Sequence, residues 1–147
     1  MNLTFSLIKP GAMQHCEEIL MAIKAEGFSI IAMKTQHLTF SQVEIFYKEH
    51  RDKSFFHEMC EGLTQGPVLL VVIHEKKGIE TPLRFRTLLG ATNPKEALPG
   101  TLRARFGVDI NSNAVHGSDS KISAIRELSF FFSGIEIGFD ITDYLPL

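Results

Sequence analysis

The sequence has few cysteines, no excess of positive charge and no long apolar run. Of its 147 residues two are cysteines, so the chain is not a disulfide scaffold. The formal net charge of −2 argues against a protein that binds nucleic acid mainly through bulk charge. No apolar stretch approaches the roughly 18 residues of a membrane-spanning helix, and the first residues lack the features of a secretory signal. We expect a cytoplasmic protein whose primary partner is neither nucleic acid nor a membrane.

Strand and helix patterns alternate along the chain. The alternation in "LTFSLI" (3–8) predicts a strand, and the unbroken apolar run "PVLLVVI" (67–73) is typical of a strand buried on both faces. Apolar residues recur with helical spacing from Cys16, and Gly27 is expected to end that helix. Further strands are predicted at 28–35 and 114–116, and further helices at about 41–50, where Ser41 is the expected N-cap, 55–62, 81–89 and 120–132.

The order of these elements favours an α/β sandwich. A ferredoxin-like βαββαβ core is the natural candidate, with a four-stranded antiparallel sheet covered by helices. No repeat or linker divides the chain, so we expect a single domain over residues 1–147. Residues 91–111 are predicted as a long loop, and a loop of that length inside a compact domain is usually functional.

His116 lies at the junction between the last predicted strand and the last helix, in "NAVHGSDS" (113–120). The residues after it are typical helix N-caps, and a helix N-terminus favours negative charge nearby. A neutral imidazole is a competent nucleophile near neutral pH, so His116 could attack a phosphoryl group and hold it. On this local pattern alone, an incidental histidine in a polar turn is the more common outcome.

Three basic residues make phosphate chemistry plausible. Lys9 follows the first predicted strand directly, Arg86 lies near the end of the 81–89 helix, and Arg103 lies in the long loop. Phosphoryl transfer depends mainly on cations around the phosphates. Each residue taken singly would be an ordinary surface charge. Neither a Walker A motif nor a kinase glycine loop is present, so a nucleotide would be held in another way.

Several motifs together resemble the nucleoside diphosphate kinase family. They are "SLIKPG", "FYKEHRDKSFF", "GPVLLVVI", "LLGATNPKEALPGTLRARFG" and "NAVHGSDSKISAIRE", and they span residues 3 to 137 in the family's order. The resemblance implies an enzyme that moves the γ-phosphate of a nucleoside triphosphate to a nucleoside diphosphate in a ping-pong cycle, with His116 carrying the phosphoryl group. A catalytically silent nucleotide-binding or scaffold module of the same fold is the alternative.

The resemblance also implies roles for other residues. Lys9 would contact the γ-phosphate and the ribose, and Arg86, Thr92 and Arg103 would bind phosphate. Asn113 would bind the sugar hydroxyls, and Phe55 would stack on the base. Glu127 and Ser118 would orient the histidine, Tyr47 would join the hydrogen bonds around it, and Asp119 would help to hold Mg²⁺ through water. The implied partners are nucleoside di- and triphosphates and further copies of the chain, in a hexamer or tetramer built from dimers.

The chain departs from the family pattern in three places. The family writes "KPDG" where this chain has "KPGAMQ", so an aspartate is missing and the segment is about two residues shorter. A short insertion before Arg86 leaves open whether Arg84 or Arg86 takes the phosphate-binding position, and spacing favours Arg86. Residues 138–147 extend beyond the family core as a C-terminal extension, which we expect either to pack on a neighbouring subunit or to hang free.

Overall fold

Four strands form one antiparallel sheet at the centre of the protein. The computed structural model describes residues 1–138, so residues 139–147, nearly all of the expected extension, lie outside the described part. The strands run in the spatial order β2-β3-β1-β4, and every neighbouring pair is antiparallel. This arrangement confirms the predicted ferredoxin-like sheet. The strands are β1 (Leu3–Ile8), β2 (Ser29–Gln36), β3 (Val68–His74) and β4 (Val115–Gly117).

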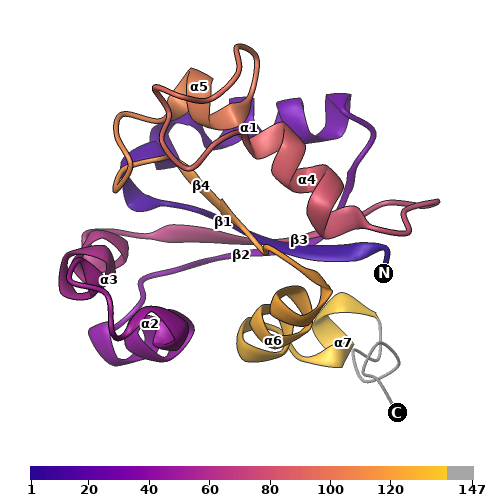
Figure 1. Ribbon diagram of the computed structural model, residues 1–147. Coiled ribbons are helices and arrows are strands. Elements are labelled where there is room, and N and C mark those ends of the chain that lie inside the picture. Colours follow the sequence, from indigo (N-terminus) through magenta and orange to yellow (C-terminus); the bar gives the residue numbers. More distant parts are fainter. Residues whose placement is uncertain (139–147) are drawn as a thin grey trace.

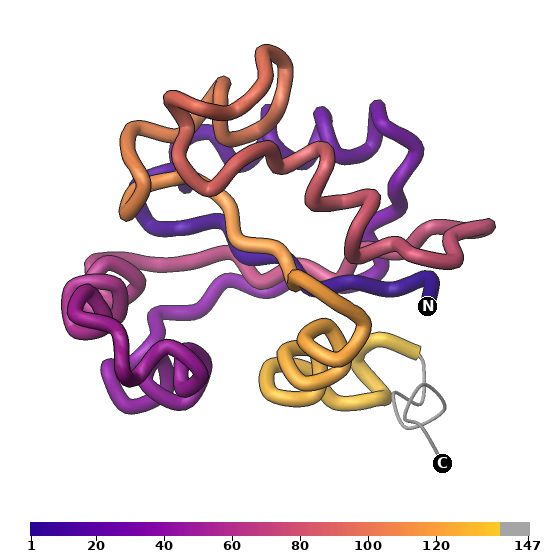
Figure 2. Tube along the Cα trace, viewed as in Figure 1, coloured from indigo at the N-terminus to yellow at the C-terminus, as the bar shows by residue number. Residues whose placement is uncertain are grey.

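Helices cover both faces of the sheet (Figure 1). On one face lie the 3-10 helix η1 (Pro10–His15), α1 (Cys16–Ala25), α4 (Thr81–Leu89) and α5 (Leu102–Phe106). On the other lie α2 (Phe40–Phe46), η2 (Lys48–His50), α3 (Phe56–Thr64), α6 (Lys121–Phe131) and α7 (Gly134–Ile137). The trace in Figure 2 shows the sheet as the middle of three layers.

Each helical layer buries its own apolar core against the sheet. Phe5 of β1 packs with Phe46 and Phe131 in the core beneath α2, α3 and α6, with ring centroids 6.0 and 5.0 Å away. Ile8, on the opposite face of β1, belongs to the core beneath α1 and α4. Successive residues of a strand point to opposite faces, so β1 serves both cores and is buried throughout.

Two glycines end helices where the sequence places them. Gly27 follows α1 with φ 89°, and Gly90 follows α4 with φ 85°, a region that glycine adopts without steric cost. The predicted N-cap of α2 is wrong. Thr39, not Ser41, caps this helix: its hydroxyl accepts the backbone N–H of Gln42, and the Gln42 side chain accepts the backbone N–H of Thr39. This reciprocal pair satisfies two free helix donors, so α2 begins before Ser41.

The predicted loop at 91–111 contains a helix that periodicity did not reveal. Thr101 caps α5 through the backbone N–H of Ala104, and five residues are too few to show a helical pattern. The final strand begins one residue later than predicted, because Ala114 occupies a γ-turn. Its φ is 73°, and the Val115 N–H donates to the Asn113 carbonyl at 2.9 Å.

Neither cysteine is paired, since Cys16 and Cys60 are both free thiols. Within residues 1–138, none of the helices combines the length and the apolar character that crossing a membrane requires.

Candidate active site

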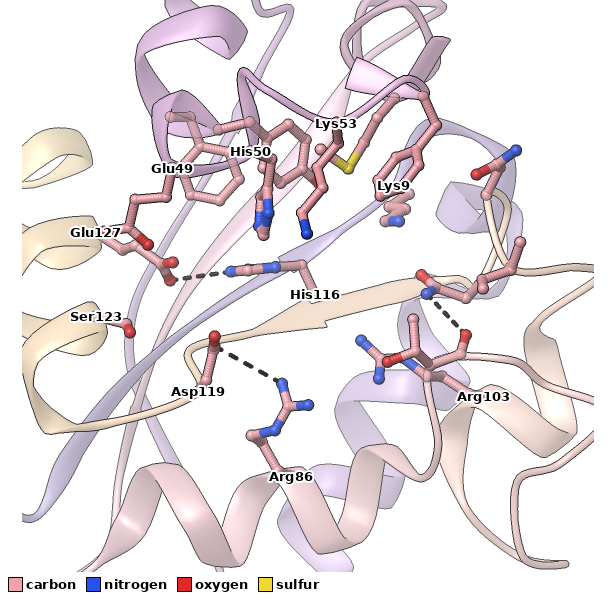
Figure 3. Close-up of a pocket in the computed structure, with 18 of the residues that line it drawn as sticks. Lys9, Glu49, His50, Lys53, Arg86, Arg103, His116, Asp119, Ser123 and Glu127 are labelled. Atoms are coloured by element: carbon pink, nitrogen blue, oxygen red, sulfur yellow. Dashed lines mark hydrogen bonds and ion pairs between the residues drawn. The ribbon is translucent and has the colours of Figure 1, made fainter. Parts of the chain in front are cut away.

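A cavity of about 500 Å³ opens where β1 and β4 meet the surrounding helices and loops. Its walls come from the residues around β1 and β4, from α4, from α6, from the loop between α4 and β4, and from a stretch we call the 46–55 segment, which links α2 to α3 (Figure 3). All the predicted site residues except Ser118 line it: Lys9, Tyr47, Phe55, Arg86, Thr92, Arg103, Asn113, His116, Asp119 and Glu127.

His116 is held firmly at one end of this cavity. It lies on β4 opposite Leu7 of β1, and its ring packs against Phe46, with centroids 5.0 Å apart. The Nε2 atom lies 2.9 Å from Oε2 of Glu127. A carboxylate accepts a hydrogen bond, so Nε2 carries the proton and Nδ1 keeps its lone pair. Nδ1 makes no hydrogen bond to any residue of the described chain, which leaves it available to a ligand.

Glu127 and Ser118 form a buried pair behind the histidine. Ser118 Oγ donates to Glu127 Oε2 at 2.6 Å, and Glu127 is 4% exposed. Burial opposes ionisation of this carboxyl, but His116, Ser118 and the guanidinium of Arg126 together hold its pKa below the usual value. Glu127 is therefore ionised at neutral pH and fixes both the tautomer and the orientation of the imidazole.

Tyr47 lies next to the histidine at the start of the 46–55 segment. Its ring centroid is 6.4 Å from that of His116, and the residue is buried. Burial raises the pKa of the phenol, and the negative charge of Glu127 acts in the same direction. The hydroxyl therefore stays protonated and can donate a hydrogen bond into the cavity.

Lys9 and Arg103 bring positive charge, and neither forms an ion pair with a carboxylate of the described residues, although Asp109 lies near enough to favour the charge of Lys9. Arg103 is 4% exposed, and it donates to the carbonyl oxygens of Val115, at 3.2 and 3.0 Å, and of Gly90, at 3.1 Å. Burial, together with the charge of Arg103, lowers the pKa of Lys9 to about 8. Burial, together with Arg86, lowers the pKa of Arg103 to about 10. Cations that depress one another's pKa favour an anionic ligand between them.

Arg86, not Arg84, faces the cavity from α4. Its Nη1 donates to the Gly117 carbonyl at 3.4 Å and lies 3.9 Å from Oδ1 of Asp119. Arg84 points elsewhere: it pairs with Glu75, donates to the Glu26 carbonyl at 2.8 Å and covers the ring of Phe28. Of the two arginines between which the sequence left the choice open, Arg86 is the one that lines the cavity.

Asn113 offers an unused acceptor. Its Nδ2 donates to the Thr92 carbonyl at 3.0 Å, which ties the long loop to the start of β4. Its Oδ1 is buried and has no hydrogen-bond partner in the described chain. A buried acceptor without a partner is costly, so this oxygen fits a ligand that brings a hydroxyl group.

Phe55 presents an open aromatic face at the other end of the cavity. Phe55 is 46% exposed and lines the cavity, whereas its neighbour Phe56 packs against the core. Ile110, also exposed, lines the cavity from the long loop. An aromatic face and an aliphatic side chain give this part of the cavity an apolar lining, which is suited to stacking against a flat ring.

A family model described as nucleoside diphosphate kinase matches residues 2–137. The chain belongs to the nucleoside diphosphate kinase family. The curated family member from Desulfovibrio desulfuricans is 45% identical over 139 residues, which cover 93% of this chain and 98% of that protein. The member from Chlamydia abortus is 44% identical over 139 residues, which cover 93% and 96%.

Solved nucleoside diphosphate kinases share the fold. The Aquifex aeolicus enzyme is similar with a TM-score of 0.87 and 38% identity, over 92% of this chain and 98% of that one. The Halobacterium salinarum enzyme, solved in complex with CDP, is similar with a TM-score of 0.86 and 30% identity, over 93% of this chain and 91% of that one. These similarities confirm the predicted family and fold.

The site prediction missed six polar residues that line this nucleoside diphosphate kinase cavity: Glu49, His50, Lys53, Asn111, Ser123 and Arg126. His50 and Lys53 line it from the 46–55 segment, and Arg126 lines it from α6. His50 and Lys53 follow Tyr47 at intervals of three residues, within the motif that supports the resemblance. That spacing could have signalled a shared side. Arg126 stands beside Glu127, and nothing in its neighbourhood distinguishes it from a solvated helix charge.

The fit to Mg²⁺ depends on Asp119. No group of three or more metal-ligating side chains occurs within residues 1–138. Asp119 lines the cavity, and its side chain is 69% exposed and only loosely engaged with Arg86. One free carboxylate suits a hydrated Mg²⁺ that arrives on nucleotide phosphates, which is how this ion commonly binds.

Proposed function

We propose that the chain transfers the γ-phosphoryl group of a nucleoside triphosphate to a nucleoside diphosphate through phosphorylated His116. Membership of the family and the names of its relatives support this activity. The observation that carries the assignment of the residue is the geometry of the ring. Glu127 holds Nε2, and Nδ1 is left free in a cavity that also contains Lys9, Arg86 and Arg103.

The three cations would hold the phosphates. Arg86 and Arg103, together with the Thr92 hydroxyl, would bind the phosphate chain, and Lys9 would meet the transferring group. Negative charge on the equatorial oxygens has to be neutralised in the transition state, and fixed cations do this without reorganising. The depressed pKa of Lys9 is consistent with such a role, because phosphate oxygens would restore the charge that its surroundings disfavour.

The chemical step exchanges one bond for another. Nδ1 of His116 attacks the γ-phosphorus, the bond to the bridging oxygen breaks, and the nucleoside diphosphate leaves. Nε2 keeps its proton and its hydrogen bond to Glu127 throughout, so the carboxylate balances the positive charge that develops on the imidazole ring. The Tyr47 hydroxyl would donate a hydrogen bond beside the ring. A second diphosphate then enters, and the same step runs in reverse.

The remaining residues would position the nucleoside. The buried Oδ1 of Asn113 would accept a hydrogen bond from a sugar hydroxyl. Phe55 would stack on the base, and every base offers a π-face to such a ring. We expect broad acceptance of bases. Asp119 would hold Mg²⁺ through water, and the ion would supply further charge neutralisation on the phosphates.

Labelling with [γ-³²P]ATP tests the proposal. The wild-type protein is expected to form an acid-labile, alkali-stable phosphoprotein that loses its label to any added nucleoside diphosphate. His116→Ala is expected to form none, yet to keep its fold and bind ADP with near-normal affinity, because the change removes the nucleophile but none of the groups proposed to bind the phosphates, the sugar or the base.

Two outcomes would contradict it. Label that persists in His116→Ala would show that another residue is phosphorylated. A wild-type protein that binds ADP but never becomes labelled would support the silent nucleotide-binding module instead.

We further propose that the protein is cytoplasmic and self-associates. Free thiols fit a reducing compartment. β2 is an edge strand of the sheet, and Met33 on β2 and Met21 on α1 are 56% and 71% exposed. An exposed strand edge with apolar side chains nearby is a ready pairing surface for another copy. Light scattering is expected to give a tetramer or a hexamer, and the 16.5 kDa monomer mass would contradict this.

A further inference from the structure

Arg126 occupies the wall of the cavity immediately before Glu127 on α6. Its side chain is 25% exposed, and it lines the same space as His116. The guanidinium is planar and carries several donors in a fixed arrangement, so it can engage several groups at once. Here it reaches groups on two different parts of the chain.

The first contacts are with the 46–55 segment. Nη1 of Arg126 donates to the carbonyl oxygen of Phe46 at 3.2 Å. Phe46 is the last residue of α2, and this oxygen is one of those that a helix end leaves without an internal partner. Nε is buried, makes no hydrogen bond, and lies 3.5 Å from Oε1 of Glu49. Arg126 therefore contacts the 46–55 segment on both sides of Tyr47, at Phe46 and at Glu49.

The second contact is with Glu127. Nη2 of Arg126 lies 3.6 Å from Oε1, whereas Oε2 receives His116 and Ser118. The two carboxylate oxygens are thus divided between the guanidinium and the histidine side. Figure 3 shows the Glu127 side chain reaching the ring of His116. A carboxylate anchored at both oxygens cannot rotate away from the imidazole.

We propose that Arg126 is a positioning residue that couples the 46–55 segment to the Glu127–His116 pair. The inference rests on the proposed function, because the segment carries Tyr47 and Phe55 to the nucleotide while Glu127 orients the nucleophile. Without Arg126, the segment meets α6 through apolar packing such as that of Phe46 on Phe131, with centroids 5.3 Å apart. Such packing tolerates sliding, so both nucleotide affinity and imidazole orientation would suffer together.

The test compares four variants in single-turnover labelling with [γ-³²P]ATP and in ADP titration. Arg126→Met is expected to slow His116 phosphorylation at least about tenfold and also to weaken ADP binding. Arg126→Lys keeps a charge beside Glu127 but cannot reach the Phe46 oxygen as well, so it should recover the rate more than the affinity. Glu49→Gln should weaken ADP binding with little change in rate. Arg105→Met is the matched control, because Arg105 is exposed on α5 and does not line the cavity.

A pH profile separates positioning from mere stability. The groups that face the Glu127 carboxyl are His116, Ser118, Tyr47 and Arg126. Removal of the guanidinium raises the pKa of this carboxyl, so the acid limb of the phosphorylation rate should move to higher pH in Arg126→Met. Glu49→Gln leaves the guanidinium beside Glu127, and its acid limb should stay in place.

The outcomes are distinct. An unlabelled wild-type protein would overturn the proposed function, and the inference with it. A labelled wild type with Arg126→Met within twofold in rate and affinity would overturn the inference alone. So would a slowed Arg126→Met with an unmoved acid limb and no rescue by lysine, since that is the behaviour of a structural residue. If Arg126→Met fails to fold, Arg126→Lys and Glu49→Gln decide, because both should weaken ADP binding more than they slow phosphorylation, and wild-type ADP affinity in both would overturn the inference.

Discussion

The backbone N–H of Lys9 donates a 2.9 Å hydrogen bond to the carbonyl oxygen of Ala114. This bond joins the residue after β1 to the residue before β4. Ala114 stands in the γ-turn with φ 73°, and Asn113 is its first residue. The side chains proposed to meet the phosphate and the sugar are therefore placed by one short turn, and backbone strain is accepted there.

Replacing Ala114 with glycine tests that strain. A non-glycine residue in this region costs on the order of 1–3 kcal/mol, which glycine avoids. Two effects of Ala114→Gly oppose this relief of strain. The variant loses a buried methyl group, and its unfolded state has more conformational entropy, so both effects destabilise the fold. Ala124→Gly, in the middle of α6, pays similar losses with no relief, because Ala124 is equally buried but helical. Chemical denaturation should show Ala114→Gly as the more stable variant by about 1 kcal/mol or more. Equal losses at the two sites would show that the turn is unstrained.

Lys9→Ala and Arg103→Ala are expected to lower kcat by more than they raise KM. Their charges should meet the transferring group mainly in the transition state. Arg103→Ala should also lower the melting temperature, because the guanidinium hydrogen-bonds to the carbonyls of Val115 and Gly90. Lys95→Ala serves as control, since Lys95 is exposed in the same loop and outside the cavity. Steady-state kinetics decide, and losses shared equally between ADP affinity and turnover would indicate uniform binding.

Nucleotide binding should take up protons in mildly alkaline solution. The pKa of Lys9 is lowered to about 8 in the free protein. Phosphate oxygens stabilise the ammonium and so raise this pKa, which means that a partly neutral Lys9 gains a proton when ADP binds. Calorimetry at about pH 8.5 in buffers of different ionisation enthalpy measures the uptake. Lys9→Met should abolish it, and the effect should fade towards pH 6.5, where Lys9 is already charged. Proton release by the wild type would contradict the assigned direction.

Replacing Gly11, the glycine in "KPGAMQ", should change the stability of the fold more than the rate of phosphoryl transfer. Lys9 caps η1 without a side-chain hydrogen bond, and a Cβ on Gly11 would meet nothing within 4 Å. Gly11→Asp therefore has room, and its carboxylate would lie in the first turn of η1, where negative charge is favourable. We expect a gain of about 0.4–1 kcal/mol from reduced unfolded-state freedom alone, which Gly11→Ala should share. Turnover should change less than about tenfold. Recovery of several orders of magnitude in Gly11→Asp would instead place the missing aspartate in the active site. Restoring the whole family segment, with its two further residues, is likewise expected to stabilise the fold with little change in turnover.

The sequence predicted the strands and longer helices well because their patterns are strong. β1 falls on the predicted residues, and β3 carries the unbroken apolar run of a strand with helices on both faces. The N-cap of α2 was predicted wrongly because several residue types can cap a helix. Thr39 and Ser41 are both competent caps, and only the reciprocal bond with Gln42 selects Thr39. α5 stayed hidden because one turn of helix has no period.

Within the site, the choice between Arg84 and Arg86 required the phase of the helix. Arg84 and Arg86 are two residues apart on α4, so they point about 200° apart and only one can face the cavity. Phe55 and Phe56 are adjacent at the start of α3, and one is taken by the core. The resemblance supplied the roles of Glu127 and Ser118, but not the guanidinium of Arg126 that holds Glu127 from the other side. The same guanidinium also donates to the carbonyl oxygen of Phe46, 80 residues earlier in the sequence, and no local pattern encodes that contact.

Because donor and acceptor would both reach His116 through the same cavity in the proposed reaction, they would occupy it in turn and compete for it. The phosphoanhydride bond broken in one nucleotide would be of the same kind as the bond made in the next, so little free energy would be dissipated in a full cycle. Any base that fits between Phe55 and Ile110 would join this exchange. The ratio of triphosphate to diphosphate for one base would thereby be passed on to all the others, and a single pocket with one nucleophile would impose a common phosphorylation potential on the whole nucleotide pool.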